Sequence, residues 1–146
     1  MSLLKKEVMR FVGLLVVVLL VVACGRKPKP QTTAPYGQKI TLTDSILTLG
    51  GSDTIRFGRM HEGEIAEKPL QLHNEGSRPM VIRSVERTCG CTTLEYKNQP
   101  LMPGQAHQLK LRFDARGEWG WQLKLLKIYL NESTEPLRLY VEADVE

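Results

Sequence analysis

The residues best suited to chemistry in this chain are two cysteines separated by one glycine, Cys89-Gly90-Cys91. In an extended segment residues i and i+2 point to the same side, so the two sulfur atoms can meet. A disulfide across so short a loop would stabilise the fold by only about 1.6 kcal/mol through chain entropy. The spacing therefore has three explanations: a reducible redox pair, two thiolates of a Cu(I) site, or two small residues that pack in a tight bulge.

Copper binding at this pair would require further ligands, because two thiolates usually do not complete a Cu(I) site. A reactive thiolate would also need a nearby cation, and Arg87 is the only positive charge close to the pair in sequence. We therefore predict no cofactor, with a copper site at Cys89 and Cys91 as the alternative. Candidate extra ligands, none at ligand spacing from the pair, are His61, His73, His107, Met60 and Met102.

No enzyme signature accompanies these cysteines. The chain contains neither a Gly-x-Ser-x-Gly nucleophile elbow nor a phosphate-binding or dinucleotide-binding glycine motif. The acidic residues are dispersed, so no pair can be nominated as general acid and base. We predict that the chain is not an enzyme, the exception being thiol oxidoreductase chemistry at Cys89 and Cys91.

Two tryptophans that flank Gly120 form a second candidate site. An exposed pair of Trp119 and Trp121 would suit contact with a protein or a glycan, since tryptophan often anchors interfaces. The alternative is that one tryptophan lies in the core and the other covers a strand edge.

Two short segments are candidates for modification. Asp44-Ser45-Ile46 and Asp53-Thr54-Ile55 resemble an O-glycosylation motif of some bacterial periplasms. The resemblance implies that Ser45 or Thr54 could carry a glycan.

Residues 1–23 have the pattern of a bacterial lipoprotein signal peptide. A basic start precedes thirteen uncharged residues, 11–23. That run is too short for a spanning helix, which needs about 20 apolar residues, and it fits the apolar region of a signal peptide. It leads into Val-Val-Ala-Cys-Gly at 21–25, which resembles a lipobox. The resemblance implies cleavage before Cys24 and lipidation of its thiol, a stable anchor when two or three acyl chains are attached.

Residues 24–39 are rich in proline and lysine and lack apolar periodicity, which predicts a semi-extended tether. Such a tether would hold a folded domain up to roughly 40 Å from the bilayer. No acidic residue follows Cys24 closely. This absence favours an outer-membrane anchor that faces the periplasm, so we expect a lipid-anchored protein of the cell envelope.

The part of the chain expected to fold carries little net charge. The whole chain has 20 basic and 16 acidic side chains and a formal net charge of +4, whereas residues 40–146 hold 13 basic and 15 acidic side chains. The positive excess therefore belongs to the signal peptide and the tether. A nucleic-acid-binding domain carries clustered Lys and Arg on its folded face, so we exclude nucleic acid as a partner.

From residue 40 onward apolar residues alternate with period two, which predicts β-strands. Residues 81–85 are apolar on both faces, as in a central strand. In residues 123–130 the apolar residues change phase, which predicts a β-bulge near Leu125-Leu126 or a strand buried on both faces. Seven or eight such strands predict an all-β fold, a single immunoglobulin-like β-sandwich over residues 40–146 behind an N-terminal signal helix and a flexible linker.

Short motifs occur in a fixed order along residues 53–146: Phe57-Gly58, Leu72-His73-Asn74-Glu75-Gly76, Cys89-Gly90-Cys91-Thr92, Pro103-Gly104-Gln105 and Phe113-Asp114-Ala115. This order resembles the DUF1573 family of bacterial envelope proteins, which is similar to immunoglobulin-like domains of the ASPM–SPD-2–Hydin and PapD-like group. The resemblance implies a fold and a location, and it assigns no catalytic residue. Departures from the family pattern are Met80, where leucine is commoner, and the aromatic Trp119-Gly120-Trp121.

Two functions of different class follow as expectations. The first is a non-enzymatic, lipid-anchored envelope module that presents loops or an edge strand to an envelope protein or a glycan. The alternative is a periplasmic thiol-redox or Cu(I)-handling protein that uses Cys89 and Cys91. The lack of a further metal ligand or of a second cation near the cysteines favours the binding module.

Overall fold

The computed structural model describes residues 37–146, and the predictions for the signal peptide over 1–23, for Cys24 and for the tether up to residue 36 lie outside these residues. Within the described part, no helix is long and apolar enough to cross a membrane. The elements in chain order are β1 (Gln38–Leu42), α2 (Ile46–Leu49), β2 (Gly51–Met60), β3 (Ile65–Asn74), β4 (Ile82–Arg87), β5 (Thr92–Glu95), β6 (Ala106–Asp114), β7 (Gly120–Leu130) and β8 (Leu137–Val145).

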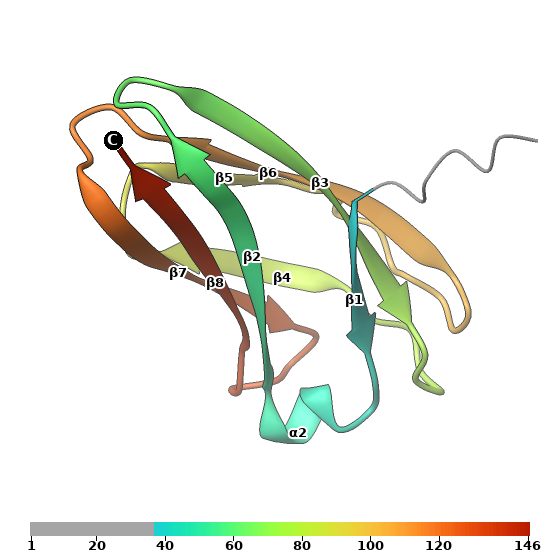
Figure 1. Ribbon diagram of the computed structural model, residues 1–146. Coiled ribbons are helices and arrows are strands. Elements are labelled where there is room, and N and C mark those ends of the chain that lie inside the picture. The colour runs from blue at the N-terminus through green and yellow to red at the C-terminus, as the bar shows by residue number, and fades with distance from the viewer. Residues whose placement is uncertain (1–36) are drawn as a thin grey trace, which may run out of the picture. The chain divides into compact units, whose positions relative to one another are not determined.

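The eight strands form two four-stranded sheets, which lie as two layers in Figure 1. Sheet A has the order β1-β3-β6-β5, and sheet B has the order β2-β8-β7-β4. β1 pairs in parallel with β3 and β2 in parallel with β8, while the other neighbouring strands are antiparallel. This arrangement confirms the predicted all-β sandwich of seven or eight strands.

The core lies between the sheets and consists mainly of the inward-facing residues of the alternating strands. In β6, for example, Leu109, Leu111 and Phe113 are buried while the residues between them are not. The period of two in the sequence therefore reflects the alternation between core and solvent. β8 contributes the longest such series, Leu137, Leu139, Val141, Ala143 and Val145.

The bulge predicted near Leu125-Leu126 in β7 is wrong. The register of β7 with β8 runs without a shift from Gly120 to Ile128. Leu126 and Ile128 are fully buried, whereas Leu123 is 47% exposed, so the strand is not buried on both faces either. The phase change arises because leucines occupy outward positions in the first half of the strand and inward positions in the second half.

The prediction that residues 81–85 form a central strand is also wrong, because β4 lies at the edge of sheet B. Its register with β7 shifts between Ile82 and Ser84. This shift lets Ile82 and Val85 both pack against the core, although they are three residues apart. An irregular edge strand thus gives the same two-faced apolar pattern as a central strand.

The open edge of β2 is partly covered by side chains from sheet A. The Gln38 side-chain amide donates to the Thr54 carbonyl at 3.1 Å, and the Lys68 ammonium donates to the Arg56 carbonyl. Lys68 also lies over the ring of Phe57. These contacts use acceptors that a partner strand would need, which is one way that proteins protect sheet edges.

Candidate functional site

The Cys89–Cys91 disulfide lies at the corner where the chain passes from sheet B to sheet A. β4 ends at Arg87 in sheet B, and β5 begins at Thr92 in sheet A. The two cysteines between them form a disulfide with their Cα atoms 5.3 Å apart, and both residues are half-buried. The sulfur atoms therefore lie at the rim of the core and not inside it.

Backbone hydrogen bonds hold this corner to both sheets. The Thr88 amide donates to the Leu125 carbonyl of β7 at 3.1 Å, and the Asp114 amide at the end of β6 donates to the Cys91 carbonyl at 2.8 Å. The Leu125 amide in turn donates to the Thr88 hydroxyl at 3.1 Å. Because neighbours in sheet A and sheet B both hold the corner, the disulfide occupies a defined position.

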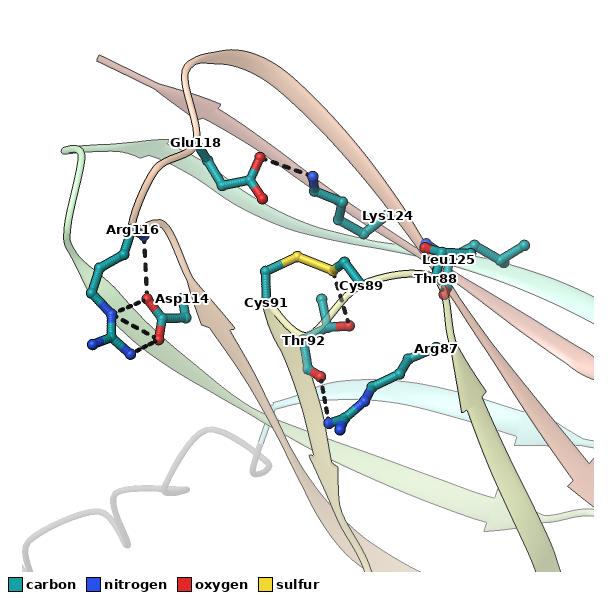
Figure 2. The surroundings of a disulfide bond; sticks show 10 residues. All are labelled: Arg87, Thr88, Cys89, Cys91, Thr92, Asp114, Arg116, Glu118, Lys124 and Leu125. Atoms are coloured by element: carbon teal, nitrogen blue, oxygen red, sulfur yellow. Dashed lines mark hydrogen bonds and ion pairs between the residues drawn. A yellow bond between two sulfur atoms is a disulfide. The ribbon is translucent and has the colours of Figure 1, made fainter.

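A surface hollow with a charged rim opens beside the disulfide (Figure 2). Arg116 donates to both carboxylate oxygens of Asp114, from Nε to Oδ1 at 2.9 Å and from Nη2 to Oδ2 at 2.5 Å. These hydrogen bonds favour the charged form of the acid and lower the pKa of Asp114 to about 2. The residues lining the hollow are Cys89, Gly90, Cys91, Asp114, Arg116 and Glu118.

Lys124 brings a charge to the inner face of β7 next to this hollow. It lies opposite the buried Val141 of β8, and its side chain is only 18% exposed. Its ammonium donates to Glu118 at 2.9 Å (Figure 2). A charge at an inward position needs such a partner, so the Lys124–Glu118 pair satisfies two polar groups beside the disulfide.

The sequence indicated Arg87 as the only cation near the cysteines, and this was wrong. Arg87 Nη1 donates to the Thr92 carbonyl at 3.3 Å, while Arg116 lines the hollow beside the sulfur atoms. Arg116 was missed because it is distant in sequence. The signal that could have found it is the antiparallel pairing of β5 with β6, in which Thr92 lies opposite Phe113. Residues just after Phe113 must then lie beside the residues just before Thr92.

The predicted extra metal ligands lie away from this corner. Met60 is buried at the end of β2, Met102 is exposed between β5 and β6, and none of the candidate ligands lines the hollow beside the disulfide. Over residues 37–146, no group of three His, Cys, Asp or Glu side chains is arranged to hold a metal ion.

The second candidate site is an exposed apolar group at the start of β7, where Trp119 precedes the strand and Trp121 and Leu123 lie on its outer face. Trp119 is 68% exposed, Trp121 is 64% exposed and Leu123 is 47% exposed. We call these three residues the aromatic patch. The alternative in which one tryptophan lies in the core is therefore wrong, because both face solvent.

Charged side chains border the aromatic patch. Trp121 lies opposite Asp144 of β8, and Leu123 lies opposite Glu142. Glu142 pairs with Arg56 of β2 at 3.2 Å. An apolar centre with a charged rim is the usual arrangement of a protein interface.

The two predicted glycosylation sites differ in accessibility. Ser45 is exposed where α2 begins, with its hydroxyl oxygen 2.8 Å from that of Thr43. Thr54 is half-buried within β2. The accessible hydroxyl of Ser45 makes it the better acceptor of the two, and glycosylation itself stays a prediction.

Comparisons with known proteins extend this description. A family model described as "Protein of unknown function (DUF1573)" matches residues 50–145, close to the 53–146 that the motifs indicated. A solved protein of unknown function from Porphyromonas gingivalis W83 is similar, with a TM-score of 0.56 and 20% identity, over 64% of this chain and 44% of that chain. The secreted serine protease VesC from Vibrio cholerae is similar with a TM-score of 0.50 and 12% identity, over 62% of this chain and 21% of that chain.

These likenesses concern the fold alone. The chain spans less than half the length of either solved structure. Among curated proteins, none matches this chain.

Proposed function

Because the chain belongs to the DUF1573 family, a family of unknown function, we propose its function from its own surfaces. It is a non-enzymatic, lipid-anchored binding module of the cell envelope, and it holds a protein partner on the aromatic patch. The observation that carries this proposal is the exposure of Trp121 and Leu123 on the outer face of β7, with the exposed Trp119 in the turn directly before this strand.

Exposed apolar side chains of this size are unusual when they occur side by side. Single apolar residues on a surface need no explanation, whereas contiguous patches often mark interaction sites. Tryptophan is also among the residues that contribute most to binding when a partner covers them. Both facts favour a surface that is covered in the working state of the protein.

The neighbours of the tryptophans favour a protein over a glycan as the partner. Leu123 and the half-buried Leu125 continue the patch along the outer face of β7. Aliphatic side chains gain free energy when they are buried against apolar protein surface. A rim of charges such as the Arg56–Glu142 pair would then fix the orientation of the partner.

The proposed anchor is a lipid on Cys24. It is supported by the uncharged run at residues 11–23 and by the lipobox-like residues 21–25. The absence of an acidic residue close after Cys24 supports the outer membrane and a domain that faces the periplasm. The tether then sets how far the aromatic patch can reach from the bilayer.

Site-specific photocrosslinking in living cells tests the binding proposal. A photoreactive amino acid replaces Leu123 in the full chain, and a matched chain carries it at Gln108, which is exposed on sheet A. We expect a discrete protein adduct from position 123, none from position 108, and loss of the adduct when Trp121→Ala is added.

Two results would count against this proposal. Equal crosslinking from both positions would show that the patch has no specific partner. An adduct removed by glycosidases and not by proteases would replace the protein partner with a glycan.

A second candidate function is thiol–disulfide exchange at Cys89 and Cys91, and the position of the disulfide favours it. The sulfur atoms border a surface hollow beside Arg116 and Glu118. Exposed or strained disulfides are typically the labile ones, whereas structural disulfides resist reduction. Since a loop this short adds little stability, exchange is a better reason for the pair than stapling.

A redox titration of the full chain tests this second function. The chain is equilibrated across a glutathione series, alkylated and weighed by intact mass. A midpoint near −200 mV or higher supports exchange, and one below about −300 mV contradicts it. Titration of the reduced chain with Cu(I) then tests the copper-handling alternative, for which two thiolates are suitable ligands.

A further inference from the structure

Thr92 is a polar residue at a core position directly beside the disulfide. It begins β5, lies opposite the buried Phe113 of β6 and is itself 0% exposed. Its hydroxyl lies 3.8 Å from Cys89 Sγ, within hydrogen-bonding range for sulfur (Figure 2). The next residue, Thr93, is exposed on the outer face of the same strand.

Packing alone does not explain a threonine here. Valine has nearly the same shape and carries no hydroxyl, and burying a hydroxyl costs free energy unless it is hydrogen-bonded. The sulfur of a disulfide is only a weak acceptor, whereas a thiolate is charged and accepts a stronger hydrogen bond. The hydroxyl of Thr92 is therefore better matched to the reduced pair than to the oxidised one.

We propose that the Thr92 hydroxyl makes Cys89 the leaving sulfur of the disulfide, so that a dithiol substrate attacks Cys91 and forms its mixed disulfide there. This inference rests on the exchange activity proposed above and adds which of the two sulfur atoms is attacked and which one leaves. The substrate class is a dithiol, such as a pair of reduced cysteines in another protein. In Figure 2 the two sulfur atoms have different surroundings, with Cys89 on the side of Thr92 and Cys91 on the side of Arg116.

The proposed exchange takes place in two steps. In the first, a thiolate of the substrate attacks Cys91 Sγ, a bond forms between these two sulfur atoms, and the Cys89–Cys91 bond breaks. Cys89 Sγ leaves with the bonding electron pair as a thiolate that accepts the Thr92 hydroxyl proton in a hydrogen bond. In the second, the other substrate thiolate attacks the substrate sulfur bound to Cys91, which forms the substrate disulfide and releases Cys91.

The electrons and protons balance over these two steps. Two electrons pass from the dithiol to the cysteine pair, so the substrate is oxidised and the pair is reduced. The two protons lost by the substrate thiols are taken up by Cys89 and Cys91 from solvent. A sulfur that is a better thiolate leaves faster, and this is why the hydrogen bond from Thr92 decides which sulfur is attacked.

The test maps which sulfur is attacked in the purified full chain. The oxidised chain is treated briefly with reduced glutathione, and N-ethylmaleimide marks the released thiol before the mixed disulfide can resolve. Tandem mass spectrometry of the tryptic peptide 88–97 then locates both labels. We expect glutathione on Cys91 and the maleimide on Cys89, with a preference of about fivefold or more over the reverse pattern.

Substitutions of two threonines separate the hydroxyl from packing. Thr92→Val should abolish the preference, Thr92→Ser should restore it, and Thr93→Val should leave it unchanged because Thr93 faces solvent. Urea unfolding of each variant shows that the fold persists. Glutathione mainly on Cys89, or an undiminished preference in Thr92→Val, would overturn the assignment while leaving exchange itself intact.

A different result would remove the exchange activity as well. If the folded wild-type chain is not reduced by excess dithiothreitol, the proposed exchange fails. The assignment of Cys91 as the attacked sulfur then fails with it. Reduction of the wild type with glutathione distributed equally between the two sulfur atoms overturns the inference alone.

Discussion

Asn74 organises one end of the sandwich through a single buried amide. Its side chain donates to the carbonyls of Arg78 and Leu101 at 2.8 Å, and its oxygen accepts the Gly76 amide at 2.9 Å. The residue is 0% exposed. One side chain thus ties the turn after β3 to the loop before β6.

Replacing Asn74 with alanine should therefore lower the free energy of unfolding by about 2–4 kcal/mol, because three backbone groups lose their partner. Urea denaturation of the full chain measures this loss. The control is Asn98→Ala, which removes an exposed amide and should change stability by about 0.5 kcal/mol or less. Equal effects of the two substitutions would contradict this role of Asn74.

Asp114 gives the disulfide corner a dependence on pH. Folding lowers the pKa of its carboxyl from 3.8 to about 2, chiefly through hydrogen bonds from Arg116. A lowered pKa means that the charged acid stabilises the folded state above pH of about 4 and that this contribution is lost as the pH falls towards 2.

Arg116→Gln should raise the pKa of Asp114 towards its ordinary value. The stabilising contribution of the charged carboxyl should then be lost at a higher pH than in the wild type. Carboxyl NMR titration of the full chain measures the pKa directly. Arg59→Gln is the control, because Arg59 pairs with Glu146 at 3.9 Å on the exposed face. An unchanged pKa in Arg116→Gln would show that the guanidinium does not cause the shift.

At the scale of elements, the disulfide links two strands that already have firm neighbours. β4 is paired with β7 and β5 with β6, so the corner between them does not depend on the covalent bond for its position. The double substitution of Cys89 and Cys91 by serine should lower the free energy of unfolding by less than about 2 kcal/mol.

Urea denaturation and circular dichroism of this double variant check the expectation. The Asn74→Ala chain provides the comparison, because its loss should be at least as large. A double variant that cannot fold would show that the disulfide is structural, and it would remove the physical reason for an exchange function.

A substitution in the aromatic patch can distinguish a binding role of Trp121 from a structural role. Trp121 is exposed, so Trp121→Ala should change the free energy of unfolding by about 0.5 kcal/mol or less. Affinity for the partner identified by crosslinking should fall about 30-fold or more, as for an interface anchor. Isothermal titration measures the affinity, and Tyr129→Ala on the same strand is the control. A loss of stability without a loss of affinity would make Trp121 a structural residue.

The strands could be predicted from the sequence because burial alternates along them, as in Leu109, Leu111 and Phe113. Alternation alone does not show which sheet neighbour a strand has. β4 was therefore placed in the centre of a sheet, and the outward leucines of β7 were attributed to a bulge. Both errors come from taking apolar character as proof of burial, whereas Leu123 is apolar and exposed.

Only part of the candidate site could be predicted, because the sequence alone does not show which strands are neighbours. Cys89 and Cys91 are two residues apart in sequence, so their proximity follows from local geometry. Arg116 and Glu118 reach them through the pairing of β5 with β6, which is a long-range contact. The role of Thr92 depends on which face of β5 it occupies, and that becomes clear only when the register is known.

At the scale of the whole molecule, the proposed lipid on Cys24 and the sandwich are separate parts of one chain. Cys24→Ser should abolish incorporation of radiolabelled palmitate and move the chain to the aqueous phase in detergent partitioning. Cys89→Ser is the control, since it leaves the lipobox-like residues 21–25 intact. Palmitate incorporation that survives in Cys24→Ser would contradict the anchor.

The parallel pairing of β2 with β8 joins segments from opposite ends of the folded part, with Gly51 beside Leu137 and Met60 beside Val145. β8 also lies between β2 and β7 in sheet B. As the chain is synthesised from its N-terminus, β2 must stay without its sheet neighbour until β8 has emerged. A ribosome that stops before β8 would release a product in which β2 has no sheet neighbour and β7 is paired only with β4, and a quality-control protease can recognise such exposed strand edges. Sheet B can therefore be completed only after β8 has emerged, although β2 is among the first strands to be made.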